Sequence, residues 1–395
     1  MRVKTLLHIL PEKSAGRMSG SQNAEADVAN LKKILLVDDD EDLREALLTQ
    51  WPQGGAWAQM HLEPLKAKGL AHDHVRLVGT GWLARIPKQS QMQLGAQENL
   101  IYQQACFERA SPAGHAPACR HVIAPCTSLP RGALIVQEIL GRSAHLPQDL
   151  PLMASSMAAM HRIELPSQKG RAPLMDALDP LQAMWEEIST QASYLAYAEL
   201  HSAVATNIQV ELERFHELCQ GAARPERRLI AFDGHPGNFV IAKESDTKEK
   251  AYLVDLEKCR YSYPSFDLAH ATLYTSTTWD LDSHTVLSVD DVVATYRAWS
   301  TQVDTALALD AERWHLPLRR AMWLWSLTWC AKWRVASRAS KAMAQDGEDW
   351  SAQNLDPVLA SHVRERVDHY LSAEGLAWVN AEFDALGQRM HALSA

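Results

Sequence analysis

Short apolar runs separated by turn residues fill the chain between about residues 60 and 141. Such runs, bounded by Gly, Pro or polar turn residues, are typical of strands. The strand-like runs are Leu65–Lys68, His74–Val78, Trp82–Pro87 and Ala133–Gly141, the last of which turns polar before its glycine. Gly79, Thr80 and Gly81 separate the second and third runs, which predicts a hairpin. One helical stretch, from Leu94 to Arg109, has apolar positions at helical spacing.

Helical periodicity dominates the chain after residue 148. The predicted helices cover residues 150–163, 176–220, 289–305, 311–344, 356–372 and 374–392. A block from residue 229 to 256 interrupts them with the strand-like runs Leu229–Phe232, Phe239–Ala242 and Ala251–Val254. The pattern therefore predicts an α+β protein, in which a small β-rich lobe leads into a large and mainly helical lobe with a short β insert.

The chain of 395 residues has 39 Lys and Arg against 48 Asp and Glu, a net charge of −9. This acidic balance argues against the broad basic surface with which nucleic-acid binders neutralise phosphates. The longest apolar run, residues 321–331, has about half the length of a membrane-spanning helix. We therefore expect neither a nucleic-acid partner nor a membrane span.

The cysteines and the N-terminal residues indicate a cytoplasmic protein. The 6 cysteines are scattered and include no Cys-x-x-Cys pair, which fits a reducing compartment better than a disulfide framework. A group of Cys and His residues between positions 106 and 126 matches no zinc-binding spacing. The apolar run near the N-terminus is broken by His8 and stopped by Pro11, short of a signal-peptide core. Residues 15–30 are small and polar, so we expect residues 1–55 to form a partly disordered leader.

Residues 33–49 contain a short apolar run followed by Asp38, Asp39 and Asp40. This segment resembles the opening strand and the acidic, Mg²⁺-binding pocket of a response-regulator receiver domain. A receiver also needs a phosphate-accepting Asp on a later strand, and residues 74–88 contain no Asp. The alternative, which we favour, is a strand or helix that begins with an acidic turn.

The block around residues 229–257 carries the candidate chemistry. Asp233 ends an apolar strand and faces a turn, where its carboxylate can take a proton from a hydroxyl group. Asn238 follows across a Pro-Gly turn, and Asp255 ends a partner strand. Their amide and carboxylate oxygens are ligands that Mg²⁺ accepts together with nucleotide phosphates. The alternative for Asp233 is a structural role, in which it caps the turn of its Asp-Gly dipeptide.

This block resembles the catalytic loop and the metal-binding Asp of the aminoglycoside phosphotransferase and choline kinase family, the protein-kinase-like small-molecule phosphotransferases. The run His235–Asn238 is similar to the form that this family shows, and Asp267 resembles the Asp that braces its catalytic loop. Upstream, Val136–Gly141 resembles the hinge and Met157–His161 the first helix of the large lobe. The resemblance implies a bilobal protein-kinase-like fold, with an N-lobe over residues 56–136, a hinge over 137–141 and a helical C-lobe over 142–395.

The resemblance also implies an ATP- and Mg²⁺-dependent transfer of the γ-phosphate to a hydroxyl group of a small molecule. Asp233 would then be the catalytic base, and Asn238 and Asp255 would hold the Mg²⁺ ion. The residues that would bind ATP are Arg85 at the phosphates, Glu98 as the ion-pair partner of Arg85, and the backbone of Gln137, Glu138 and Ile139 at the adenine.

The chain departs from the family pattern in two places. Ala231 stands where the family has a His, two residues before the catalytic Asp. Residues 69–74 replace the glycine-rich run that covers the nucleotide, and Asp73 would repel phosphates unless it turns outward. A nucleotide-binding pseudokinase or regulatory module without phosphotransfer is therefore the alternative function. For Arg85 the alternative is an exposed strand position, with Lys88 as the competing phosphate contact.

Tryptophan is enriched, with 13 Trp against 6 Phe, and Trp325, Trp329 and Trp333 share one helical face. These rings could form a core stripe, which we favour, or a wall of the acceptor pocket. In the second case they would attract a cationic acceptor, which the acidic net charge would also suit. The acceptor classes left open are an amino alcohol, an aminoglycoside and a sugar.

Overall fold

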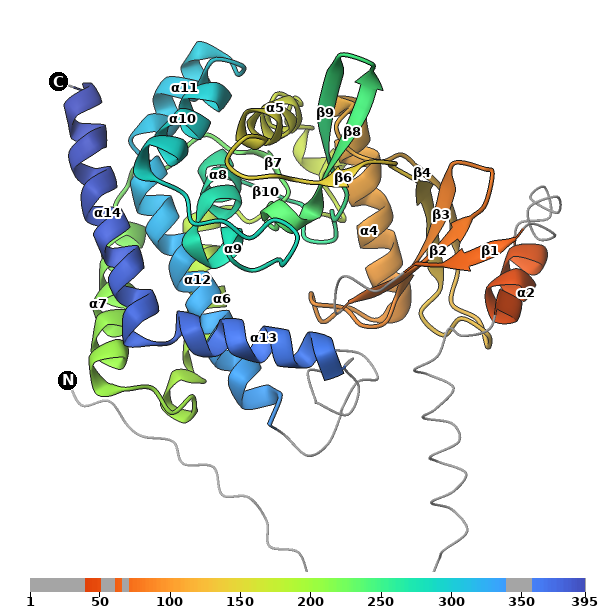
Figure 1. Cartoon of the computed structure of the whole chain (residues 1–395), viewed down its shortest axis with the longest axis horizontal. Helices are drawn as coiled ribbons and strands as arrows, with labels where there is room; N and C mark the ends of the chain where they lie inside the picture. Colours follow the sequence, from red (N-terminus) through yellow and green to blue (C-terminus); the bar gives the residue numbers. More distant parts are fainter. Residues whose placement is uncertain (1–39, 51–60, 66–70, 339–356, 395) are drawn as a thin grey trace, which may run out of the picture.

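An antiparallel sheet forms the centre of the smaller lobe in the computed structural model, which describes residues 40–50, 61–65, 71–338 and 357–394 (Figure 1). Its strands are β1 (Leu62–Pro64), β2 (His72–Leu77), β3 (Trp82–Pro87), β4 (Cys119–Ile123) and β5 (Ala133–Gln137), in the spatial order β1-β2-β3-β5-β4. Gly79 and Gly81 turn the β2–β3 hairpin with positive φ angles of 80° and 75°, which glycine adopts readily. The predicted strand Leu65–Lys68 extends beyond the described residues, and β1 lies just before it.

Helices cover both faces of this sheet because successive side chains along a strand point to opposite faces. On β5, Leu134 and Val136 pack in the core that α4 (Ala96–Ala110) shares, whereas Ile135 packs in the core of α2 (Asp40–Gln50). Buried Leu43 and Leu47 of α2 fill that second core. Residues 40–50, which fall inside the expected leader, therefore form a helix that packs on the sheet. Asp38 and Asp39 of the receiver-like segment lie outside the described residues.

Short strands surround the loop between residues 231 and 238, where the chain enters the larger lobe. β6 (Arg142–Ser143) pairs with β8 (Phe239–Ser245), which pairs with β9 (Lys248–Leu253), and β7 (Arg228–Ile230) pairs with β10 (Arg260–Ser262). Gly141 precedes β6, and a Cβ atom there would lie 2.4 Å from the carbonyl oxygen of Ile241. The loop leaves β7 and enters β8, so sheet pairing fixes both of its ends.

Helices form most of the larger lobe (Figure 1). They are α5 (Leu150–His161), α6 (Pro180–Ala192), α7 (Ser202–Gln220), α8 (Pro264–Thr272), α9 (Tyr274–Thr277), α10 (Val289–Ser300), α11 (Thr305–Glu312), α12 (His315–Ala336), α13 (Pro357–Tyr370) and α14 (Ala373–Ser394). Single 3₁₀ turns occur at Ser111–Ala113, Gln168–Gly170, Leu195–Tyr197 and Pro236–Asn238. The predicted stretch 176–220 is therefore two helices, α6 and α7, which a 3₁₀ turn separates.

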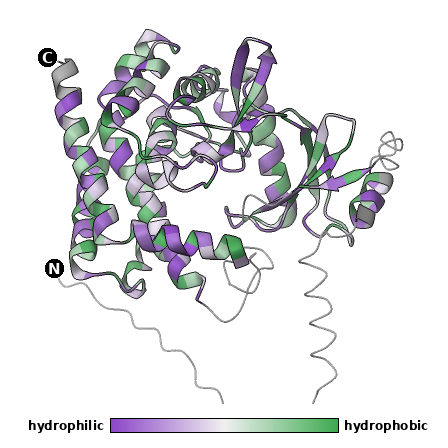
Figure 2. Ribbon diagram, viewed as in Figure 1, coloured by the Kyte–Doolittle hydropathy of each residue, from purple (hydrophilic) through white to green (hydrophobic). Residues whose placement is uncertain are grey.

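Helix α12 lies inside the larger lobe, and α6, α7, α8, α13 and α14 pack around it. Of the tryptophan stripe, Trp325 and Trp333 are buried in the core of this lobe, which confirms the core interpretation for these two rings, and Trp329 is partly buried against that core. The more peripheral α13 and α14 carry both hydrophilic and hydrophobic residues along their length (Figure 2), as expected when one face of a helix packs and the other meets solvent. Among the described helices, none combines the length and the apolar character that crossing a bilayer requires.

Candidate active site

The loop between β7 and β8 is held in an unusual backbone conformation. Phe232 has a φ of 64°, in the left-handed region, which costs a non-glycine residue roughly 1–2 kcal/mol. The carboxylate of Asp267, at the first turn of α8, accepts the N–H groups of Ala231 and Phe232 at 2.8 and 2.7 Å. Asp267 thus braces the loop, as the sequence suggested.

A buried chain of hydrogen bonds in turn orients Asp267. The indole Nε1 of Trp299 donates to Nδ1 of His161 at 2.9 Å, so Nε2 of His161 carries the proton that points at Asp267 Oδ2, 3.1 Å away. His161, Asp267 and Trp299 are all fully buried. Helices α5, α8 and α10 therefore fix the loop together, and His161 has a structural place here.

Asp233 follows Phe232 and pairs with a lysine from the loop after β9. The ammonium Nζ of Lys258 lies 2.8 Å from Asp233 Oδ2 and 5.7 Å from the centre of the Trp325 ring. Burial alone would raise the pKa of Asp233, but the Lys258 ammonium, together with His235 and His270, outweighs burial and lowers that pKa below its ordinary value. Asp233 therefore stays ionised, and Lys258 is a site residue that the sequence reasoning missed.

Asn238 and Asp255 lie together at one end of the β8–β9 hairpin. The strands pair Phe239 with Leu253, and the N–H of Val254 donates to the carbonyl oxygen of Asn238 at 3.0 Å. The side-chain amide of Asn238 donates its Nδ2–H to the carbonyl oxygen of Asp233 at 2.8 Å, which turns Oδ1 away from that bond. An amide oxygen beside a carboxylate is an oxygen donor set of the kind that suits Mg²⁺.

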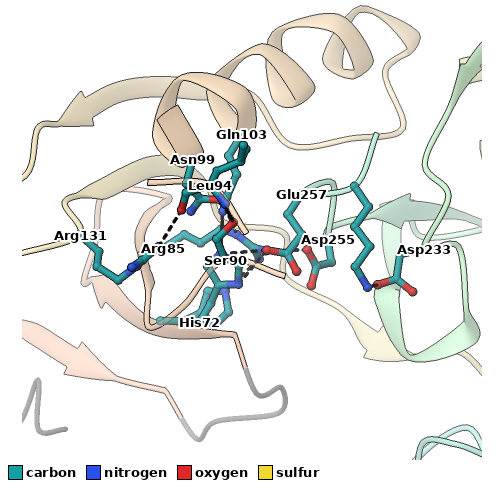
Figure 3. A network of polar contacts seen from close by, with 12 residues as sticks. His72, Arg85, Ser90, Leu94, Asn99, Gln103, Arg131, Asp233, Asp255 and Glu257 are labelled. Carbon is teal, nitrogen blue, oxygen red and sulfur yellow. Dashed lines mark hydrogen bonds and ion pairs between the residues drawn. The ribbon is translucent and has the colours of Figure 1, made fainter. Parts of the chain in front are cut away.

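Arg85 reaches this carboxylate from the smaller lobe (Figure 3). Its Nη2 lies 2.5 Å from Asp255 Oδ1 and 3.1 Å from Nδ1 of His72, and its Nε donates to Gln103 Oε1 at 3.4 Å. Nε2 of His74 lies 3.4 Å from Nη1. Arg85 is only 3% exposed, so the alternative of an exposed strand position is wrong. The guanidinium connects the lobes at the position where the phosphates are expected.

The expected partner of Arg85, Glu98, does not contact it. Glu98 is exposed in the first turn of α4, whereas Gln103 lies on the face of α4 that packs against the sheet. The prediction of an Arg85–Glu98 ion pair is therefore wrong. Lys88 pairs with Asp73 at 3.0 Å, which neutralises the carboxylate that the sequence placed near the phosphates. The pairing of Lys88 leaves Arg85 as the residue that faces the site.

Glu257 adds a second buried carboxyl group beside Asp255. Its Oε2 has no hydrogen-bond partner and lies 3.6 Å from Nε2 of His72. Burial, reinforced by the charge of Asp255, raises the pKa of Glu257 to about 8. His72, Asp255 and Glu257 place one ligand atom each within 4.8 Å of one another, and no other such group occurs in the described residues. The Cys and His residues between positions 106 and 126 therefore do not gather into a metal site.

The hinge begins at the last residue of β5, and its residues differ in their backbone bonding. The N–H of Gln137 donates to Ala118 at 2.8 Å, and the N–H of Glu138 donates to Gly81 at 2.9 Å. The Glu138 carboxylate accepts from Arg76 Nε at 2.5 Å. For Ile139, the described residues provide no partner for the N–H. Of the three backbone N–H groups expected near adenine, that of Ile139 is therefore the one left available.

A family of known proteins matches the part of the chain that contains these residues. A model of the phosphotransferase enzyme family matches residues 61–322 of the chain, a range that includes every residue named above as part of the loop, the hairpin and the Arg85 cluster. A search of curated protein sequences gives no significant match.

Solved structures share the architecture at low sequence identity. Plasmodium vivax ethanolamine kinase is 12% identical, with a TM-score of 0.58, over 93% of this chain and 98% of that one. A mutant of aminoglycoside 2'-phosphotransferase-IIIa in complex with GDP is 15% identical, with a TM-score of 0.54, over 85% of this chain and 100% of that one. A choline/ethanolamine kinase family protein from Mesorhizobium loti is 15% identical, with a TM-score of 0.50, over 87% and 99%.

These likenesses establish a protein-kinase-like fold, with a β-rich N-terminal lobe and a mainly helical C-terminal lobe. The family match spans residues 61–322, about two thirds of the chain, so the chain belongs to the phosphotransferase enzyme family.

Proposed function

We propose that the protein transfers the γ-phosphate of ATP, bound with Mg²⁺, to a hydroxyl group of a small molecule. The observation that carries this proposal is the convergence of four side chains from two lobes. Asp233 and Asn238 come from one loop, Asp255 from the hairpin beside it, and Arg85 reaches Asp255 from the smaller lobe at 2.5 Å. Catalysis of phosphoryl transfer rests mainly on such positioning and on neutralising charge.

In this proposal Asp233 orients the acceptor hydroxyl and takes its proton. Its lowered pKa makes it a weak base, so orientation is the larger part of its role. Lys258, whose Nζ lies 2.8 Å from Asp233 Oδ2, lies where its positive charge can stabilise the phosphoryl group during transfer. A bound Mg²⁺ would supply charge neutralisation at the phosphates, with Asn238 and Asp255 as its protein ligands. Arg85 would then turn from Asp255 to the phosphates.

The nucleotide base is proposed to bind at the hinge through the N–H of Ile139. One structural neighbour, aminoglycoside 2'-phosphotransferase-IIIa, was solved in complex with GDP. Another neighbour, an aminoglycoside phosphotransferase of the APH(2'') type, was solved in complex with GDP and kanamycin. Nucleotide use by this chain is consistent with these complexes. An amino alcohol, an aminoglycoside and a sugar are all acceptors to test, and both ATP and GTP are nucleotides to test.

The test is a consumption assay with Mg²⁺ and either ATP or GTP, across ethanolamine, choline, kanamycin and glucose. Turnover with one acceptor is expected, and Asp233→Asn should lower kcat by about 10²–10⁴-fold. The matched control is Asp246→Asn at the exposed β8–β9 turn, which should leave kcat unchanged. Mg²⁺-dependent nucleotide binding with no turnover of any acceptor, unaffected by Asp233→Asn, would instead support the pseudokinase alternative that Ala231 raised.

A further inference from the structure

One helix holds both backbone polar groups of Phe232, the residue that precedes Asp233. Phe232 adopts its left-handed conformation with a bulky side chain, so its neighbours must fix the backbone there. On the N–H side, Asp267 accepts at 2.7 Å. On the carbonyl side, Nδ1 of His270 lies 2.9 Å from the oxygen of Phe232. Because a carbonyl oxygen only accepts, Nδ1 of His270 carries the proton of that bond.

His270 is suited to hold the peptide group between Phe232 and Asp233. It lies three residues after Asp267, so one face of α8 presents both side chains to the loop. The ring is 7% exposed and is enclosed by Trp325, whose ring centre lies 6.2 Å away in an edge-to-face arrangement, and by His235 at 5.9 Å. Packing therefore fixes the ring as well as its hydrogen bond.

The contact between His270 and Asp233 is indirect. Nδ1 of His270 lies 3.7 Å from Asp233 Oδ1, beyond hydrogen-bond distance, and its proton already serves the carbonyl of Phe232. His270 instead hydrogen bonds the carbonyl oxygen of Phe232, which lies in the peptide plane between Phe232 and Asp233. Rotation of that plane would move the Asp233 carboxylate away from Lys258 and from the acceptor hydroxyl. Ala231, the neighbour on the other side, has no side-chain donor that could replace this bond.

We propose that His270 is the positioning residue for Asp233: its Nδ1–H locks the carbonyl of Phe232 and so aims the carboxylate. This inference rests on the proposed phosphotransferase function for its kinetic consequence. Its structural part, that the His270 imidazole holds the Phe232 backbone, rests only on the geometry of α8 and the loop.

The experiment compares two substitutions of similar size in the full chain. His270→Asn places an amide N–H near the position of Nδ1, and His270→Leu removes the donor while it keeps most of the volume. With Mg–ATP and the acceptor that gives the highest turnover among those proposed, His270→Leu should lower kcat by about 100-fold. KM for ATP should change less than about threefold, and His270→Asn should recover most of the lost kcat. The melting temperatures of both variants show whether the two lose stability alike.

Crystal structures of the two variants separate this inference from the proposed function. In His270→Leu we expect Phe232 to leave the left-handed region and Asp233 to move from Lys258, and in His270→Asn we expect both to stay. Wild-type loop geometry in both variants would overturn the inference, whether or not the protein turns over any acceptor. Equal loss of kcat in both variants, in step with their loss of stability, would also overturn it. Turnover by no acceptor in the wild type, with the loop displaced only in His270→Leu, would count against the proposed function and support the structural role of His270.

Discussion

The charges around Asp233 are arranged to keep its carboxylate ionised and oriented at the same time. Lys258 supplies the charge at 2.8 Å, and Asn238 ties down the carbonyl oxygen of Asp233 itself. Trp325 packs against both Phe232 and the Lys258 ammonium, with ring centres 5.2 Å apart in the first case. Lys258 is 8% exposed, so its interaction with Asp233 is only weakly screened by solvent. The lysine should therefore influence both the rate and its pH dependence.

Replacement of Lys258 by Met should lower kcat and shift the pH profile. The substitution removes the positive charge that, in the proposed function, stabilises the transferred phosphoryl group, so kcat should fall by about 10²–10³-fold. The same ammonium lowers the pKa of Asp233, so its removal raises that pKa and moves the acid limb of kcat/KM to higher pH. Profiles of kcat/KM from pH 4 to 9 measure both effects. Lys258→Arg keeps the charge and should hold the acid limb in place; an unchanged limb in Lys258→Met would contradict the assigned contact.

Some residues of the candidate site could be predicted from the sequence because they form a motif with regular spacing. Others could not, because only their contacts in the folded chain identify them. Asp233, Asn238 and Asp255 lie at strand ends in one block, so their convergence followed from a local hairpin. Lys258 lies 25 residues from Asp233 and Gln103 lies 18 residues from Arg85, and no motif in the sequence marks either residue. Glu98 is a carboxylate on the helix expected to supply the partner of Arg85, but the face that α4 turns to the sheet carries Gln103 instead.

Strand pairing positions the site elements, and the pairs that sequence periodicity missed are the short or irregular ones. Strand β3 begins and ends where the apolar run predicted, because its side chains alternate between two buried faces. Strand β4 was not predicted, since its run Cys119–Ile123 is polar at the centre and pairs with β5 through a register shift. Strand β6 has too few residues to show a period. Gly132, before β5, and Gly141, before β6, lie where the chain passes close to the backbone of a neighbouring strand.

Gly141→Ala should destabilise the protein much more than Gly79→Ala. A Cβ atom at Gly141 would lie 2.4 Å from the Ile241 carbonyl oxygen, so β6 and β8 would have to separate, at a cost of about 2–4 kcal/mol. Gly79 has a positive φ of 80° but no atom within 4 Å of an added Cβ, so strain alone costs about 1–2 kcal/mol there. Urea unfolding of both variants measures the difference. Equal losses would mean that the β6–β8 contact tolerates displacement.

One hydrophobic core joins the two lobes. It contains Leu100 and Phe107 of α4, Leu134 of β5, and side chains of α5, β8 and α10 in the larger lobe. Unfolding of α4 would therefore remove packing contacts from the core of the larger lobe, which favours cooperative unfolding of both lobes. Burial lowers the pKa of several histidines in this joined structure, and the pKa values of His74 and His270 fall to about 4. Acid should therefore weaken the molecule as a whole.

His315, on α12, provides the clearest case for testing this acid sensitivity. It is 3% exposed, it hydrogen bonds Ser265 Oγ through Nδ1 at 2.9 Å, and burial lowers its pKa from 6.5 to about 3. Above pH 6.5 both the folded and the unfolded chain hold a neutral imidazole, so the stability contribution is fully present. As the pH falls, the unfolded chain takes up the proton first, and stability is lost at up to about 1.4 kcal/mol per pH unit until the folded pKa is reached.

Between pH 7.5 and 5 this one residue should therefore remove about 2 kcal/mol from the free energy of unfolding. His315→Asn keeps a side-chain group near Ser265 and cannot titrate, so its free energy of unfolding should fall by about 2 kcal/mol less than that of the wild type over the same interval. The lost ring contact with Tyr296, now 4.5 Å between centres, lowers the stability of the variant at every pH and so cancels in the comparison of slopes. Urea unfolding at pH 7.5, 6.5, 5.75 and 5 gives both slopes. Parallel curves for the two proteins would show that His315 does not resist protonation in the folded state.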